Sequence, residues 1–201
     1  MTLPSFVEAR RSIRAFAADL VPRSELDALI EAACLAPAPH HSRPWRFVVA
    51  DGDAAKAALA DAMGARWRHD LQGDGIDGAR IDELVGSSRD RLTGAPALVL
   101  ACLTSDGLDH YPDARRQQAE WGMALLSLGA AVENLMLAAA DAGLASCWVA
   151  APIFCPDEAG ASLALPPEWG PQALVMVGYP EPGYRARIRP PVPLDDLRLW
   201  R

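Results

Sequence analysis

Histidines and arginines are the residues of this sequence whose types and spacing could do chemistry. His40 and His41 are adjacent within "APAPHHSRPWRF", residues 36–47, and adjacent histidines suggest either metal binding or acid–base work. In an extended segment neighbouring side chains diverge, and His69 and His110 lie in other predicted loops. We therefore expect no metal site. The prolines instead predict a rigid loop whose histidines contact a ligand.

Arginines gather near both ends of a chain whose formal net charge is -7. They are Arg10, Arg11 and Arg14 near one end and Arg185, Arg187 and Arg189 near the other. Guanidinium groups, a hydroxyl such as that of Ser12 and backbone amides suit a phosphate monoester. Each cluster is either a solvated surface or half of a phosphate cradle, and the second interpretation requires both ends to meet in space.

The composition of the chain argues against several classes of protein. The 201 residues suffice for one domain, 1–201, and 51% of them are apolar, which argues against disorder. The acidic balance argues against a nucleic-acid partner. Four irregularly spaced cysteines predict reduced thiols rather than a zinc site or disulfides. The apolar stretch 123–140 contains Glu133 and Asn134, which argues against a membrane span, and no signal peptide is evident. We expect a cytoplasmic protein.

Motifs for protein-based catalysis are missing from the sequence. Neither glycine-rich phosphate loop, G-x-G-x-x-G or G-x-x-x-x-G-K-[ST], occurs. The G-x-S-x-G nucleophile elbow and the H-E-x-x-H metal motif are also missing. A hydrolase would thus lack a recognisable nucleophile.

Helices and strands that would position these residues follow from apolar periodicity. Helices are predicted at 3–10 (with Thr2 as cap), 26–34, 53–63, 81–92 and 114–142, and strands at 46–50, 95–103, after Gly143, and at 172–180. Because helices and strands do not alternate strictly, the pattern favours an α+β fold.

Two segments stand outside this pattern. Residues 64–78, "GARWRHDLQGDGIDG", are rich in glycine and aspartate, which predicts a mobile lid. Trp67 and His69 in it either contact substrate or belong to an ordinary surface loop. The tail after Pro180 has too much proline for a packed element, and we expect it to run along a partner subunit.

The long helix is apolar on nearly every side through "MALLSLGAAVENLMLAAA", residues 123–140. Such a helix must be covered all round, which a domain of this size rarely achieves alone. We therefore predict a homodimer with this helix at its interface. The alternative is a central helix in a monomer.

Four stretches in this order resemble the FMN-dependent nitroreductase family. They are "RRSIRAF", "APAPHHSRPWRF", "GLASCWV" and "VMVGYPEPGYRARIR", and the resemblance covers essentially the whole chain. The family's usual loop is closer to A-P-S-x-x-N-x-Q-P-W. The His-His-Ser-Arg-Pro-Trp found here is similar to the C-terminal reductase domain of the bacterial glutamyl ligase that makes deazaflavin coenzyme F-420, which would here stand alone.

The resemblance implies an α+β fold with a central mixed or antiparallel sheet flanked by helices, in a homodimer whose two FMN sites are built by both chains. By position, Arg10, Arg11, Ser12 and Arg14 would hold the phosphate and the pyrimidine end of the ring. Arg185 and Arg187 would reach the phosphate. His40, His41 and Ser42 would contact the flavin of the other subunit, and Ala150, Ala151 and Pro152 would place backbone amides against the ring.

The implied activity is hydride transfer through bound FMN in a ping-pong cycle, with no protein nucleophile. The electron donor would be NAD(P)H or a reduced deazaflavin. The His-His-Ser-Arg loop suggests the dehydro precursor of coenzyme F-420 as acceptor. Two alternatives stay open: a general NAD(P)H-dependent nitro or quinone reductase, and a non-catalytic flavin- or deazaflavin-binding protein.

Overall fold

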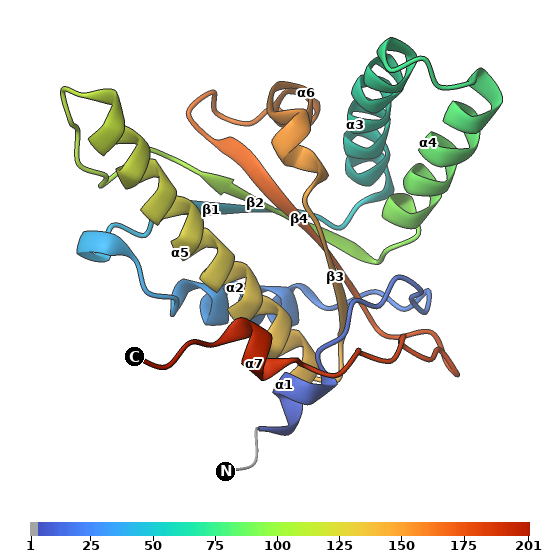
Figure 1. Ribbon diagram of the computed structural model, residues 1–201. Coiled ribbons are helices and arrows are strands. Elements are labelled where there is room, and N and C mark those ends of the chain that lie inside the picture. Colours follow the sequence, from blue (N-terminus) through green and yellow to red (C-terminus); the bar gives the residue numbers. More distant parts are fainter. Residues whose placement is uncertain (1–3) are drawn as a thin grey trace.

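A four-stranded antiparallel sheet forms the centre of the fold (Figure 1). The computed structural model describes residues 4–201, so the predicted cap at Thr2 lies outside the described residues. The strands are β1 (Trp45–Ala50), β2 (Ala97–Leu103), β3 (Ala145–Val149) and β4 (Gly170–Gly178), in the order β1-β2-β4-β3, with each neighbouring pair antiparallel. This sheet between helices confirms the predicted α+β class.

The inner strands are buried on both faces, as the continuous apolar run of β2 predicts. All seven residues of β2 are buried. Val99 and Leu103 belong to one core cluster, whereas Leu98, Leu100 and Cys102 belong to the other. The sheet therefore separates two apolar cores.

Helices cover each face of the sheet. Helix α2 (Arg23–Cys34) and α5 (Ala114–Asp141) pack on one core, and α3 (Asp53–Gly73) and α6 (Pro156–Ser162) on the other, with α4 (Gly78–Thr93) against α3. Short elements complete the chain: α1 (Ser5–Ala9), α7 (Leu194–Leu197) and the 3-10 turns η1 (Pro39–His41) and η2 (Ala151–Phe154). Most predicted elements are confirmed with boundaries moved by a few residues.

The predicted loop at 64–78 is wrong, because most of it is helical, while its role as a lid stays a prediction. Helix α3 continues to Gly73 and α4 begins at Gly78, so the two form a helical hairpin with a turn of only four residues. A Cβ on Gly64 would lie 3.1 Å from Val85 Cγ1, so this glycine permits the close approach of α3 and α4. Tertiary packing here outweighs the low helix propensity of glycine.

Helix α5 has one buried and one exposed apolar face. Ala124, Leu128 and Leu135 are buried in the core. Trp121, Met123, Leu125 and Leu126 stay 36%, 39%, 37% and 78% exposed. Within residues 4–201, α5 is the one helix long and apolar enough to cross a membrane, and 44% of its most apolar stretch is buried inside the chain.

Candidate functional site

The N-terminal segment lies along the β3 edge of the sheet. Ile13 N–H donates to the Ser146 carbonyl at 3.0 Å, and Ala17 N–H donates to the Tyr179 carbonyl at 2.9 Å. These bonds fix the backbone of residues 10–17 against the sheet. The segment that carries Arg11, Ser12 and Arg14 is therefore held in place although it has little regular structure.

The C-terminal segment reaches the same place through Arg189 and Glu181. The Arg189 guanidinium donates to the carbonyl of Arg10, and Glu181 N–H donates to the Ala15 carbonyl at 3.2 Å. Figure 1 shows the red C-terminal segment running beside α1 and the blue N-terminal segment. The two ends of the chain thus meet, which is the condition that the phosphate-cradle interpretation requires.

Charge at this junction is mostly uncompensated. Arg10 Nε pairs with Glu133 Oε1 of α5 at 3.0 Å. Among the described residues, Arg11, Arg14, Arg185 and Arg187 form no ion pair. Arginines without ion pairs on two segments that meet favour an anionic ligand. Because Glu133 already pairs with Arg10, the other arginines are better candidates for binding a phosphate.

The histidine loop has an unusual backbone. His40, His41 and Arg43 have φ values of 54°, 54° and 48°, in the left-handed region that non-glycine residues rarely adopt. The expectation of an extended segment is therefore wrong, because the loop closes into the turn η1. Each such residue costs about 1 kcal/mol or more. Strain of this kind persists only where surrounding contacts hold it, and it clusters at functional sites.

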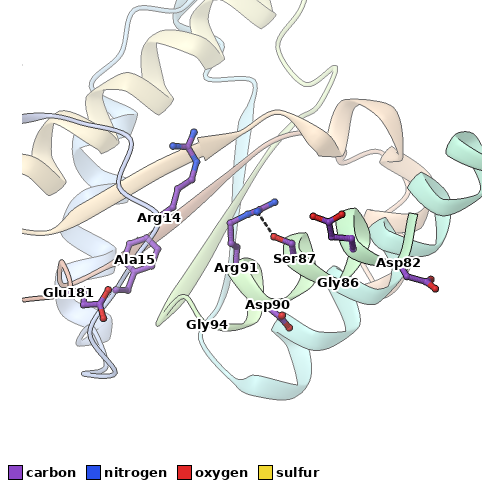
Figure 2. A pocket seen from close by; sticks show the side chains of 11 residues that line it. Arg14, Ala15, Asp82, Gly86, Ser87, Asp90, Arg91, Gly94 and Glu181 are labelled. Carbon is purple, nitrogen blue, oxygen red and sulfur yellow. Dashed lines mark hydrogen bonds between the residues drawn. The ribbon is translucent and has the colours of Figure 1, made fainter. Parts of the chain in front are cut away.

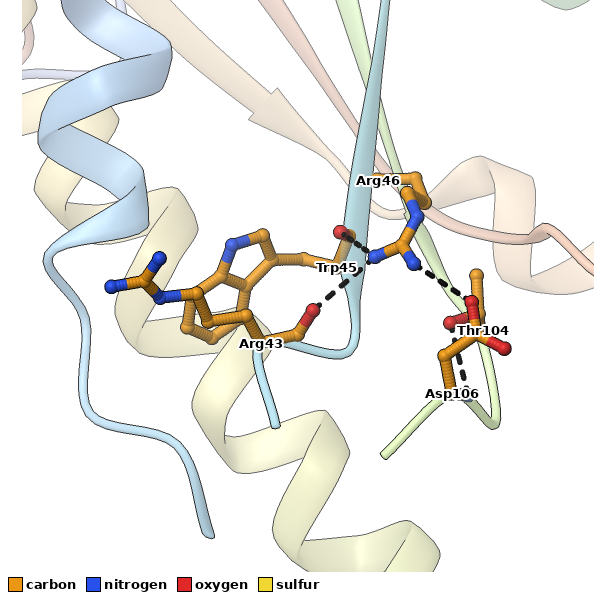
Figure 3. Close-up of polar contacts among 5 residues, drawn as sticks. All are labelled: Arg43, Trp45, Arg46, Thr104 and Asp106. Atoms are coloured by element: carbon orange, nitrogen blue, oxygen red, sulfur yellow. Dashed lines mark hydrogen bonds and ion pairs between the residues drawn. The ribbon is translucent and has the colours of Figure 1, made fainter. Parts of the chain in front are cut away.

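Arg46 is the residue that holds this loop (Figure 3). Its guanidinium donates to the carbonyls of Arg43 at 3.3 Å and Trp45 at 2.8 Å, and to Asp106 Oδ2 at 2.7 Å. Asp106 N–H in turn donates to the buried Thr104 hydroxyl at 3.2 Å. The loop between β2 and α5 thereby fixes the exit of the histidine loop into β1.

Acidic groups from the same side reach His40. His40 Nε2 lies 3.6 Å from Asp109 Oδ2, and the buried Glu120 accepts the Asp109 N–H at 3.2 Å. Ligand atoms of these three residues lie within 4.8 Å of one another, an arrangement that could hold a metal ion. The sequence does not suggest this cluster, because Asp109 and Glu120 are distant from His40 along the chain.

Residues 150–152 follow β3, and Ala151 and Pro152 enter η2. Ala150 is exposed, Ala151 is half-buried and Pro152 is buried. Ala150 and Ala151 line a cavity of about 510 Å³ between η2 and the α3–α4 hairpin. Trp67 also lines this cavity, whereas His69 is exposed and does not. Of the two predicted substrate contacts, only Trp67 is therefore positioned near a cavity.

Three buried cysteines are poor nucleophiles. Burial raises the pKa of the Cys155 thiol to about 11 and that of the Cys102 thiol to about 12. Burial also raises the pKa of Cys147, although the charges of Arg14 and Arg91 oppose that change. At neutral pH these thiols stay protonated, so none is an activated catalytic cysteine.

Sequence reasoning missed two residues that the structure places at these features, Arg46 and Arg91. The sequence pattern places Arg46 only in a strand, and its contact with the loop depends on Asp106 from a distant loop. Arg91 lies on α4, and the cavities that it lines depend on how the α3–α4 hairpin packs. No spacing in the sequence could identify either residue.

Comparisons with known proteins agree with this architecture. The chain is 32% identical to the NADH dehydrogenase of Thermus thermophilus, over 96% of this chain and 92% of that protein. A BluB-like flavoprotein from Clostridium difficile shares the fold with a TM-score of 0.80 at 22% identity, over 100% of this chain and 99% of that one. A nitroreductase with bound FMN from Bacteroides fragilis has a TM-score of 0.73 at 24% identity, over 94% of each chain.

The chain belongs to the nitroreductase family, which its residues 7–179 match. This assignment confirms the resemblance drawn from the four ordered stretches and makes the chain an oxidoreductase. The matched range includes the N-terminal arginines, the histidine loop and residues 150–152. It ends before Arg185 and Arg187, whose position rests on the contacts of the C-terminal segment.

Proposed function

We propose that this chain is an FMN-dependent oxidoreductase that passes electrons from NAD(P)H, or from a reduced deazaflavin, to a second substrate in a ping-pong cycle. The meeting of the two arginine-bearing chain ends, through Arg189 and the Arg10 carbonyl, is the observation that carries the proposal. The FMN-bound nitroreductase from Bacteroides fragilis and the NADH dehydrogenase from Thermus thermophilus support the cofactor and the nicotinamide donor.

The residues present fit an FMN phosphate. Arg11, Arg185 and Arg187 form no ion pair among the described residues, and the exposed Ser12 follows Arg11 directly in the chain. A dianionic phosphate monoester is the ligand that several guanidinium groups and a hydroxyl bind best. The contact of Arg189 with the Arg10 carbonyl supports this interpretation over a merely solvated surface.

Arg14 and residues 150–152 would contact the isoalloxazine ring of the flavin. Bound FMN would supply the two-electron chemistry. The Arg14 guanidinium would stabilise negative charge at the pyrimidine end, because a fixed cation costs no reorganisation. Ala150 and Ala151 would position the ring through backbone N–H groups. Since the partner's histidine loop would complete the site, the active unit would be the homodimer.

For the acceptor we propose the dehydro precursor of coenzyme F-420. The His-His-Ser-Arg sequence of the histidine loop supports it, because it departs from the family's usual loop. A general nitro or quinone reductase is the second candidate, supported by the similarity to the Thermus thermophilus NADH dehydrogenase. A binding protein without turnover is the third.

Cofactor content and donor kinetics test these proposals in order. The purified protein should be yellow with about one FMN per chain, and a protein that cannot be loaded with FMN would contradict the main proposal. Anaerobic stopped-flow mixing with NADH, NADPH and reduced deazaflavin should bleach the flavin with at least one donor. If no donor reduces it, the binding-protein alternative holds. Turnover with simple quinones but not with the F-420 precursor would favour the general reductase.

A further inference from the structure

The cavity between η2 and the α3–α4 hairpin has the size and lining of a small-molecule site. Its volume of about 510 Å³ falls within the range of ligand pockets. Met63, Leu92 and Ala60 supply apolar walls. Trp67 and Phe154, which are 38% and 76% exposed, add aromatic surfaces that a flat ring could pack against.

Three arginines line this cavity, and two of them are neutralised by acidic neighbours. Arg66 pairs with Asp70 at 3.0 Å, and Arg89 pairs with Asp61 at 2.6 Å. Arg91 forms no ion pair with any residue in 4–201; its Nη1 donates to the Ser87 hydroxyl at 2.8 Å. The neutral hydroxyl orients the guanidinium, which has no carboxylate within ion-pair distance, although Glu83 and Asp90 line the neighbouring cavity with it.

Arg91 also lines a second cavity, of about 590 Å³, whose opposite wall includes Arg14. Figure 2 shows the Arg14 and Arg91 side chains extending into the space between the N-terminal segment and α4. Because both residues line this one cavity, their guanidinium groups face the same space. Arg91 therefore lies where the α3–α4 cavity borders the proposed ring end of the flavin site.

We infer that the α3–α4 cavity binds the oxidising substrate, a flat conjugated acceptor that carries an anionic group, and that Arg91 recognises the anion. This inference rests on the proposed FMN-dependent function. The aromatic walls hold the conjugated part of the acceptor, and Arg91 holds its carboxylate or phosphate at the end nearer Arg14. Arg66 and Arg89 contribute less, because Asp70 and Asp61 already satisfy them.

A matched pair of acceptors tests the charge requirement. Para-nitrobenzoate and para-nitrobenzamide have the same shape and differ in charge; in each, NADH and a proton reduce the nitro group to nitroso and water, releasing NAD⁺. The holoenzyme should prefer the benzoate. Arg91→Gln should raise the KM for the benzoate about tenfold, the effect of losing one charge-assisted hydrogen bond. The KM for the benzamide and both kcat values should change less than about threefold.

Arg89→Gln is the matched control, because Arg89 lines the same cavity with its charge paired to Asp61. It should leave the benzoate preference unchanged, and Arg91→Lys should restore part of it. Calorimetric titration of the oxidised protein with para-nitrobenzoate gives a readout independent of turnover. Weaker binding in Arg91→Gln alone supports the inference; equal effects of Arg89→Gln and Arg91→Gln, or equal losses for both acceptors, overturn it.

Failure of the inference can be told from failure of the proposed function. FMN content and the rate of flavin reduction by NADH are measured first in each variant. If both are normal and charge discrimination is missing, the cavity assignment is wrong and the FMN-dependent function stands. If the protein neither binds FMN nor is reduced, the proposed function fails and the inference falls with it.

Discussion

At the scale of single residues, the histidine loop shows how backbone conformation indicates a site that residue type alone leaves ambiguous. His40, His41 and Arg43 adopt the left-handed region at three of four consecutive positions. Arg46 and the Thr104–Asp106 turn hold them there. A ligand-contact loop and a metal site remain distinct hypotheses for the histidines, and a direct test separates them.

Replacing both histidines with asparagine should weaken FMN binding without any metal effect. Asparagine tolerates the left-handed region, so the loop should keep its shape. We expect about a tenfold rise in the FMN dissociation constant, equivalent to one or two lost hydrogen bonds. Fluorescence titration of the apoprotein with FMN measures it, and His69→Asn, on the exposed side of α3, is the control.

Metal analysis of the same proteins decides the competing hypothesis. A chelator should leave the activity of the unaltered protein unchanged, and elemental analysis should find no stoichiometric metal. Loss of activity with chelator, restored by a divalent cation, would contradict the flavin-contact hypothesis. It would instead assign His40, Asp109 and Glu120 as ligands.

At the scale of elements, the sequence predicted the strands and most helices well and the α3–α4 hairpin poorly. The apolar run of β2 predicts a strand buried on both faces, because a short continuous apolar run is typical of such strands. The prediction of a loop at residues 64–78 failed because glycine and aspartate favour loops locally. Their helical state comes from packing of α3 on α4, as the close approach at Gly64 shows, and that contact is not visible in one sequence.

Gly178, at the end of β4, should be intolerant of any side chain. A Cβ there would lie 2.6 Å from Pro96 Cδ and 2.9 Å from Phe16 Cδ1. Gly178→Ala should lower the free energy of unfolding by about 1–3 kcal/mol, the usual cost of overpacking. Chemical denaturation measures it. Gly86→Ala, with no atom within 4 Å of its Cβ, is the control and should not destabilise; an equally stable Gly178→Ala would disprove the contact.

Phe16 links this glycine to the site. It forms a bridge with Pro180 and belongs to the segment that carries Arg14. Displacing Phe16 should therefore move the N-terminal arginines as well. We expect Gly178→Ala to lose FMN affinity in addition to stability.

At the scale of the whole molecule, exposed apolar surface supports the proposed homodimer. The exposed face of α5 continues into a groove of about 310 Å³ lined by Pro37, Pro39, Met123 and Leu126, among others. In the C-terminal tail, Ile188 and Trp200 are 95% and 78% exposed. Contiguous apolar surface of this kind typically marks a protein interface. The sequence predicted this surface from the apolar character of the long helix.

Leu126→Glu should convert the proposed dimer into a monomer. Leu126 is 78% exposed within one chain, so a charge there should disturb the interface and not the core. Light scattering coupled to size-exclusion chromatography measures the mass, and FMN content should fall with it if both chains build each site. Ile76→Glu, at the tip of the α3–α4 hairpin far from α5 in Figure 1, should stay dimeric. A dimeric Leu126→Glu protein would contradict this interface.

The connection from β1 to β2 has a consequence for how such an enzyme can diversify. These strands are direct neighbours, paired from Trp45 with Leu103 to Ala50 with Leu98, and the whole α3–α4 hairpin lies between them in sequence. The hairpin can change its length or residues without shifting the strand register. The hairpin side of the proposed acceptor pocket could thus change as one contiguous segment, whereas its other wall, from Val149 to Cys155, is fixed by β3 and η2. The proposed cofactor site has no such freedom, because its residues come from both ends of the chain and must change together.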